Sequence, residues 1–240
     1  MQTLSKFGKV SQIIIWDLFR APVIAFLVAQ ARRLCRPMVP RASPQATGMV
    51  LHEDYSASHL KRLIIRPLSR SAIPISLASA FSWPQTNTHS ILLVGPRYES
   101  DYFMLRGYGF SPERITLLDQ FSTSPKIQIG DAHAMPYPDG CFDIVILSWC
   151  LAYSSHPEQM LKESWRTLAR DGILICCSES YDSYESINQE TTLDGPNAPD
   201  LSSSAVLRLL PEHADVLAAF DSPLTTDGVR MVSCIAAKKI

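Results

Sequence analysis

The sequence has no excess of charge of either sign. It contains 22 Lys and Arg against 23 Asp and Glu, which gives a formal net charge of −1. Proteins that bind the phosphate backbone of a nucleic acid usually carry a basic surplus, because phosphate contacts supply most of the affinity. The balance therefore predicts that nucleic acid is not a partner.

Metal-binding and hydrolase motifs are also missing. None of the six cysteines forms a C-x-x-C pair, and the Cys and His residues do not cluster as a zinc site requires. The chain has no G-x-S-x-G elbow either. Several cysteines lie in apolar runs, which is typical of reduced core thiols in a cytosolic compartment. We therefore predict no metal site and a cytoplasmic protein.

The N-terminal region lacks an uninterrupted apolar run of membrane-spanning length. Residues 13–36 are the most hydrophobic stretch outside the α/β pattern, but Asp17, Arg20 and Pro22 interrupt it, and a span needs about 20 apolar residues. Two interpretations remain. Residues 12–36 form an amphipathic helix that makes peripheral contact with a membrane, or a helix that packs on its own domain or on a second subunit. The sequence leaves both open.

The residues that are present form a clear strand–helix–strand pattern. Residues 142–147 are an almost unbroken apolar run of strand length, and residues 173–177 are a second such run. Between them, a helix is predicted from Pro157, a residue favoured at the first helical position, to a stop at Asp171-Gly172. A βαβ unit of this kind predicts a parallel sheet.

Further strands are predicted on both sides of this unit. Residues 90–95, 115–118 and 126–129 have strand character, and each is followed by a turn or a polar residue. Residues 213–220 and 229–237 flank a turn at 226–228 and are predicted to pair in antiparallel fashion. Sequence alone thus favours an α/β fold whose sheet ends in antiparallel strands.

Four motifs resemble the class I S-adenosylmethionine (SAM) dependent methyltransferases, in particular the type 11 methyltransferase domain. They are Gly130-Asp131-Ala132, residues 135–139 (MPYPD), residues 142–145 (FDIV) and residues 168–172 (LARDG). The resemblance covers roughly residues 90–178. It implies a Rossmann-like, doubly wound, mostly parallel seven-stranded sheet with an antiparallel C-terminal strand, preceded by the N-terminal apolar helix. We divide the chain into a helix and linker (1–48), a helical cap (49–88) and the methyltransferase-like domain (89–240).

The resemblance also implies SAM as the cofactor and indicates residues that would hold it. Asp119 ends a strand about 24 positions after Gly95, a spacing that suits a carboxylate accepting both ribose hydroxyls. The alternative role of Asp119 is to cap a turn. In the family, an aspartate at the place of Asp131 accepts the adenine amino group, and the small Ala132 lets the backbone approach the ring. Gly95 is the glycine that follows the first strand.

The glycine-rich turn departs from the family pattern. Leu93 stands where an acidic residue is usual, and Arg97 and Glu99 stand where two further glycines are usual. In one account, Arg97 pairs with the carboxylate of SAM, while Glu99 or Asp101 takes its ammonium group. In the other, these bulky side chains fill the cofactor slot, and the domain binds nothing or a different ligand.

The acceptor side is expected just past the strand at 142–147. The resemblance implies that Ser148, Trp149 and Tyr153 line the acceptor pocket. We assign no catalytic residue: His156 is the only general-base candidate, and His133 fits a loop histidine better. The predicted function is SAM-dependent methyl transfer to a small-molecule, lipid-linked or saccharide acceptor. The alternative is a non-catalytic scaffold or binding module. The oligomeric state is not predicted.

Overall fold

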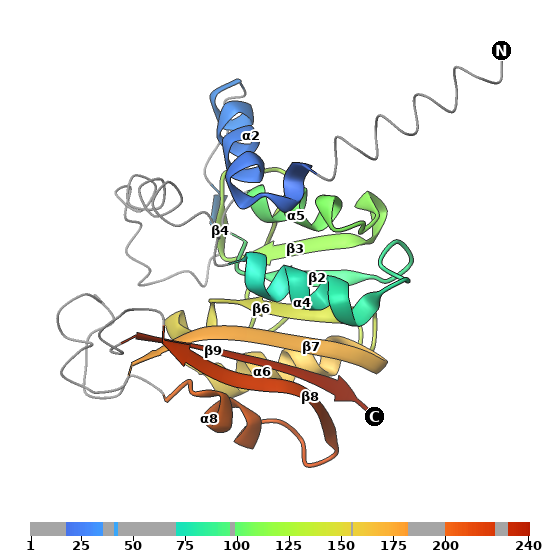
Figure 1. Ribbon diagram of the computed structural model, residues 1–240, viewed down its shortest axis with the longest axis vertical. Coiled ribbons are helices and arrows are strands. Elements are labelled where there is room, and N and C mark those ends of the chain that lie inside the picture. The colour runs from blue at the N-terminus through green and yellow to red at the C-terminus, as the bar shows by residue number, and fades with distance from the viewer. Residues whose placement is uncertain are drawn as a thin grey trace.

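The computed structural model describes residues 18–35, 41–42, 71–96, 99–154, 156–181, 200–223 and 230–240. Their central feature is a seven-stranded sheet in the order β5-β3-β2-β6-β7-β9-β8 (Figure 1). Its strands are β2 (Ile91–Val94), β3 (Ile115–Asp119), β5 (Gln128–Ile129), β6 (Phe142–Ser148), β7 (Leu168–Tyr181), β8 (Ala214–Pro223) and β9 (Arg230–Lys239).

Strands β5, β3, β2, β6 and β7 are mutually parallel, whereas β9 runs antiparallel to both β7 and β8. The predicted Rossmann-like, mostly parallel sheet is therefore confirmed. A separate antiparallel pair joins β1 (Arg41–Ala42) to β4 (Phe121–Ser122).

Helices cover both faces of the sheet. The first face carries α2 (Pro22–Cys35), α4 (Ala72–Ser82) and α5 (Ser100–Gly107), and the second carries α6 (Pro157–Thr167) and α8 (Ser203–Arg208) (Figure 1). Three 3-10 turns, η1 (Leu18–Arg20), η2 (Pro112–Arg114) and η3 (Leu151–Tyr153), connect these elements. The arrangement is a three-layer α/β sandwich.

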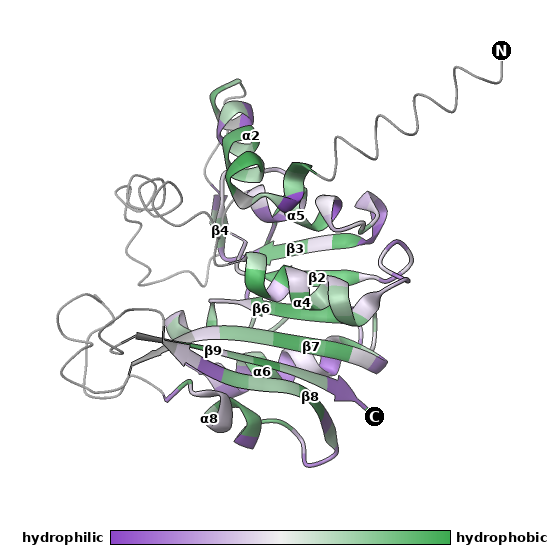
Figure 2. Ribbon diagram, viewed as in Figure 1, coloured by the Kyte–Doolittle hydropathy of each residue, from purple (hydrophilic) through white to green (hydrophobic). Residues whose placement is uncertain are grey.

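Alternation along the central strands divides the core between the two faces. Ile91 and Leu93 pack beneath α4 and α5, whereas Leu92 and Val94 pack against α6. Successive side chains of a strand point to opposite faces of the sheet. Because helices cover both faces here, every position of β2 is apolar. Figure 2 shows β2, β6 and β7 as the hydrophobic centre of the molecule.

Asp143 joins the start of β6 to the start of β2. Its Oδ2 accepts both the backbone N–H and the hydroxyl of Ser90, each at 2.7 Å. Asp143 thus holds the backbone together where the two strands begin.

The boundary between α6 and β7 differs from the prediction. The helix ends at Thr167, and β7 begins at Leu168, so Asp171-Gly172 lies within the strand and does not stop the helix. Asp171 has a φ of 63°. A Cβ on Gly172 would lie 2.9 Å from the carbonyl oxygens of Ala169 and Asp143. The Asp-Gly pair marks a close approach between strands, for which glycine is suited.

The N-terminal helix packs on the domain. Ala25 and Ala29 of α2 are buried in the cluster that also contains Phe103 of α5. The ring of Phe19 stacks on that of Phe103, with the two ring centres 5.2 Å apart. Within the described residues, no helix combines the length and apolar character needed to cross a bilayer. The described part of 12–36 thus supports the packed-helix interpretation.

Of the region assigned to a helical cap, 49–70 lies outside the described residues, and α4 is its described helix. Residues 182–199 also lie outside them. The proposed division into domains stays a prediction.

The six cysteines are free, and they differ in exposure. Cys35 at the end of α2 is exposed, Cys141 and Cys150 are half-buried, and Cys176, Cys177 and Cys234 are buried in the sheet.

Candidate active site

The carboxyl ends of β5, β3, β2 and β6 lie side by side. From β2 the chain adds β3 and β5 on one side of the sheet, then returns to add β6 and β7 on the other. Parallel sheets bind ligands at such a switch point, outside the carboxyl ends of the strands. Gly95, Asp119, Asp131 and Ser148 follow or end these strands, so the topology brings four predicted site residues to one edge.

Gly95 occupies a turn that a side chain would strain. Its φ is +89°, and a Cβ would lie 3.0 Å from Cys150 Cβ and 3.1 Å from the carbonyl oxygen of Ser148. Its N–H donates to the carbonyl of Leu118 at 2.9 Å. The turn after β2 is thus held between the ends of β3 and β6.

Replacing Gly95 by alanine should therefore destabilise the fold by about 1–3 kcal/mol, because the left-handed backbone and the close contacts both oppose a Cβ. Gly140 is a matched control: its φ is +65°, but the nearest atom to an added Cβ lies at 3.8 Å. Urea unfolding of both variants measures the difference. Equal losses would mean that the contacts around Gly95 are not tight.

Asp119 ends β3, next to Ile129 of β5. Its Oδ1 accepts the N–H of Phe121 at 3.1 Å, the turn-capping contact considered for this residue. The side chain is half-buried. Asp119 therefore caps a turn, and its ribose contact stays a prediction.

Asp131 follows β5, and its contacts within the described part of the chain use Oδ1. That oxygen accepts the backbone N–H of His133 at 2.9 Å and the amide of Gln120 at 3.3 Å, and it lies 2.7 Å from His133 Nδ1. Burial alone would raise the pKa of Asp131, but these hydrogen bonds outweigh it and lower the pKa below its ordinary value. The carboxyl group is therefore ionised at neutral pH. The next residue, Ala132, is buried in the core.

His133 connects Asp131 to the segment after β6. Its Nε2 lies 2.6 Å from Ser154 Oγ, which also accepts the N–H of His156 at 3.1 Å. This pattern favours the tautomer with the proton on Nδ1 and the Ser154 hydroxyl donating to Nε2. Sequence reasoning treated His133 as a loop histidine, and no spacing signal pointed to Ser154.

The loop that follows Asp131 is anchored by Arg166 of α6. Its guanidinium donates to the carbonyls of Met135 and Tyr137 at 3.1 and 2.9 Å and pairs with Glu163 at 2.8 Å. Glu163 in turn accepts the N–H of Met135 at 2.9 Å. These contacts hold the MPYPD segment against α6.

Asp101, in the first turn of α5, is a buried carboxyl group near Asp119. It is 7% exposed and accepts hydrogen bonds from the hydroxyls of Ser71 at 3.0 Å and Ser100 at 3.4 Å. Burial raises its pKa to about 6, and repulsion from Asp119 adds to the rise. Ser71 Oγ also lies 3.5 Å from Ser148 Oγ, so Asp101 belongs to the polar group at the strand ends.

Glu99 has a different environment. It is 3% exposed, and its carboxylate contacts Arg32 of α2 and Ser124. Arg97 lies outside the described residues. The two accounts of the altered turn therefore stay open at Arg97.

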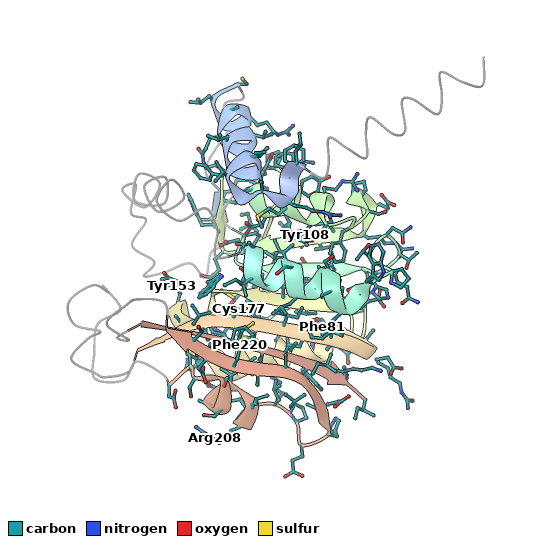
Figure 3. The ribbon with its side chains drawn as sticks, viewed as in Figure 1. Phe81, Tyr108, Tyr153, Cys177, Arg208 and Phe220 are labelled. Atoms are coloured by element: carbon teal, nitrogen blue, oxygen red, sulfur yellow. The ribbon has the colours of Figure 1, made fainter. Side chains whose placement is uncertain are left out.

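The predicted acceptor residues lie in three different settings. Ser148 is buried at the end of β6, and Tyr153 on η3 is half-exposed at the edge where the parallel strands end (Figure 3). Trp149 has a φ of 61° and is buried in a cluster with Cys177 and Cys234 beneath α4. The side chain of His156 is exposed, and its Nδ1 lies 3.7 Å from Glu158 Oε1. The acceptor roles of Ser148, Trp149 and Tyr153 stay predictions.

No group of three or more His, Cys, Asp or Glu side chains is arranged to hold a metal ion within the described ranges. The chemistry of the strand ends is that of carboxylates and hydroxyls. Such groups accept hydrogen bonds from hydroxyl, amino and ammonium groups.

Comparison with known proteins agrees with this architecture. Residues 98–176 match the family model described as a methyltransferase domain. Ajmaline N-methyltransferase from Rauvolfia serpentina is 29% identical over 93 residues, which cover 36% of this chain and 31% of that protein. The chain thus matches less than a third of the length of its curated relative.

Two solved structures share the fold. A geranyl diphosphate C-methyltransferase from Streptomyces coelicolor A3(2), in complex with Mg²⁺, geranyl diphosphate and S-adenosyl-L-homocysteine, superposes with a TM-score of 0.55 and 13% identity. The match covers 83% of this chain and 89% of that one. The MccD protein superposes with a TM-score of 0.54 and 13% identity, over 70% and 96% of the two chains.

The strand order and the solved structures agree on one fold, and residues 98–176 match the methyltransferase domain family. SAM is the cofactor that this family implies. Residues 98–176 thus match a methyltransferase domain, within a sheet that has the fold of a solved methyltransferase.

Proposed function

We propose that this chain transfers the methyl group of SAM to a small-molecule, lipid-linked or saccharide acceptor. One observation carries the proposal: Asp119 and Asp131 end or follow neighbouring parallel strands, beside the left-handed turn at Gly95. Adenosine presents two ribose hydroxyls and one amino group as donors, and two carboxylates at adjacent strand tips are suitable acceptors.

The chemistry of the side chains fits an adenosine group. In the proposal, Asp119 accepts the ribose hydroxyls, Asp131 accepts the adenine amino group, and the backbone at Ala132 approaches the ring. The lowered pKa of Asp131 supports this role, because an ionised carboxylate accepts hydrogen bonds more strongly than a neutral one. Gly95 supports close approach of the turn to the ligand.

Asp101 is the better of the two acidic candidates for the ammonium group of SAM. The Glu99 carboxylate is already paired with Arg32 and hydrogen-bonded by Ser124. Asp101 instead contacts hydroxyl groups and lies near Asp119. Arg97, which would pair with the SAM carboxylate, stays a proposal from the sequence.

The bound cofactor would supply an electrophilic methyl group on a sulfonium sulfur. The contribution of this chain is to hold an acceptor in line with that group, which accounts for much of the catalysis such a reaction needs. Ser148, Trp149 and Tyr153 are proposed to line the acceptor side. Ajmaline N-methyltransferase and geranyl diphosphate methyltransferase are named for small-molecule acceptors, which favours that class here. We do not include membrane contact through 12–36, because α2 uses buried residues to pack on α5.

A non-catalytic scaffold is the second candidate. The contacts of Glu99 favour this candidate. Glu99 stands where the family usually has a glycine, and its side chain connects Arg32 of α2 to Ser124. In a scaffold, the carboxylates at the strand tips would have no ligand to bind.

Titration of S-adenosylhomocysteine into the purified full chain separates the two candidates. The proposal predicts saturable heat in calorimetry and a higher unfolding temperature, since a ligand at 100 times its Kd stabilises the native state by about 2.7 kcal/mol. ATP serves as the control, because it shares the adenosine group but its triphosphate would face the carboxylate of Asp101. A chain that responds equally to both ligands, or to neither, would refute the methyltransferase and retain the scaffold.

A further inference from the structure

Glu99 is a buried acid that joins three segments. It precedes α5, and its side chain is 2% exposed. Its Oε2 accepts a hydrogen bond from Arg32 Nε of α2 at 2.8 Å, and its Oε1 accepts the hydroxyl of Ser124 at 2.6 Å. The N-terminal helix, the turn after β2 and the segment after β4 therefore meet at one carboxylate.

A buried carboxylate needs its partner. Taking a carboxylate out of water is strongly unfavourable unless an opposite charge and hydrogen bonds compensate for the lost hydration. Arg32 supplies the charge, and its guanidinium also lies 5.6 Å from the centre of the Phe103 ring. Loss of Arg32 would leave the Glu99 charge uncompensated beside the turn.

A second arginine fixes the same region of the N-terminal segment. Arg41 donates to the carbonyls of Ser124 and Ile127, and its strand pairs with Ser122 of β4. The segment from Phe121 to Ile127 follows Asp119 directly in the chain. The N-terminal segment thus contacts the chain after both proposed cofactor-binding strands, β2 and β3.

We infer that residues 18–35 and 41–42 are a structural part of the cofactor site, and that Arg32, acting through Glu99, is a positioning residue for the chain between β2 and α5. The inference rests on the proposed function. In the usual turn, glycines let the backbone close around the cofactor. Here Glu99 replaces one of them, and its ion pair with α2 holds the chain at the start of α5.

Arg32→Ala should weaken the binding of S-adenosylhomocysteine at least tenfold. Arg20→Ala is the matched control, because Arg20 ties η1 to the far end of α5 through the carbonyl of Gly107 at 2.9 Å. Its affinity should stay within twofold of the wild type. Calorimetry on the full chain measures both variants, and equal affinities for Arg32→Ala and the wild type would overturn the inference.

A double variant separates positioning from a general loss of stability. Arg32→Met leaves Glu99 charged and unpaired, whereas Arg32→Met with Glu99→Gln removes both charges at similar volume. The double variant should bind S-adenosylhomocysteine at least threefold more tightly than Arg32→Met, because the uncompensated charge is gone. A double variant no better than Arg32→Met would contradict the role of the ion pair.

Hydrogen exchange tests, without a ligand, whether the ion pair between Arg32 and Glu99 holds the start of α5 in place; this role of the ion pair is called the anchor below. Backbone amides of 99–104 should exchange at least tenfold faster in Arg32→Met than in Arg20→Ala, and the double variant should recover slower exchange. If the wild type fails to bind S-adenosylhomocysteine, the proposed function fails, and this measurement still decides on the anchor. Equal exchange in the two single variants would reject it.

Discussion

Asp119→Ala should weaken the binding of S-adenosylhomocysteine by about 100-fold or more. The proposed contact joins one carboxylate to two ribose hydroxyls, and each hydrogen bond to a charged group contributes about 1.5–3 kcal/mol. A loss of about 3 kcal/mol or more corresponds to at least two orders of magnitude in Kd. Calorimetry on the wild type and the variant, at the same pH and salt concentration, measures the change.

Two further variants make the Asp119 result specific. Asp119→Asn keeps an oxygen that can accept the N–H of Phe121, the contact that Oδ1 makes at 3.1 Å, so its fold should resemble the wild type more closely while ribose binding stays weak. Glu113→Ala changes an exposed acid just before β3 and should leave affinity unaltered. Wild-type affinity in Asp119→Ala would show that the ribose contact has been misplaced.

Asp101→Asn should stabilise the protein at pH 8 and weaken its binding of S-adenosylhomocysteine at least tenfold. Burial raises the pKa of Asp101 from 3.8 to about 6, a difference of roughly 2 pH units that corresponds to about 3 kcal/mol. At pH 8 the native state bears this cost of a buried charge, and asparagine does not. Ser71 can donate to the amide oxygen of asparagine as it does to the carboxylate.

The pH dependence of the Asp101 effect has a definite sign. Between about pH 3.8 and 6 the native state binds more protons at Asp101 than the unfolded state does, so this group favours folding most below pH 3.8. Its contribution is lost as the pH rises to about 6. Urea unfolding should therefore show a stability gain for Asp101→Asn that is largest above pH 6 and disappears near pH 4. Asp215→Asn, at an exposed position, should change stability by less than about 0.5 kcal/mol at any pH.

A truncated ligand separates the roles of the two acids. 5′-Methylthioadenosine contains the ribose and adenine of SAM but has no amino-acid group, so it has no ammonium for Asp101 to accept. Asp119→Ala should weaken both ligands, whereas Asp101→Asn should weaken S-adenosylhomocysteine alone. A lower stability of Asp101→Asn at pH 8, or equal losses for both ligands, would contradict the proposed role of Asp101.

Sequence patterns predicted the sheet because its central strands are continuous apolar runs. Residues 91–94, and residues 142–148 except Asp143, are buried, and a buried strand of this kind can be predicted from its run of apolar residues. The end of α6 was harder to predict. Lys239 donates to the carbonyls of Trp165 and Leu168 at 2.7 Å, and a contact across more than 70 residues leaves no local signal at Asp171-Gly172.

The candidate site was predictable only where strands end. Asp119 was predicted because it ends an apolar strand about 24 positions after Gly95, and Asp131 was predicted from the resemblance of Gly130-Asp131-Ala132 to the family motif. Their partners come from remote segments: Ser71 hydrogen-bonds Asp101 from 30 positions away, and Ser154 contacts His133 from 21 positions away. Tertiary folding alone brings these side chains together. The connection of Arg32 to Glu99, 67 positions apart, was unpredictable for the same reason.

The distribution of the cysteines allows the N-terminal helix to be labelled selectively. Cys35 is exposed at the end of α2, whereas burial raises the pKa of Cys150 to about 12 and raises the pKa of Cys176 well above its ordinary value. Maleimides react with thiolates, which Cys150 and Cys176 rarely form at neutral pH. A maleimide fluorophore should thus attach first at Cys35, where its anisotropy would report how firmly α2 is docked.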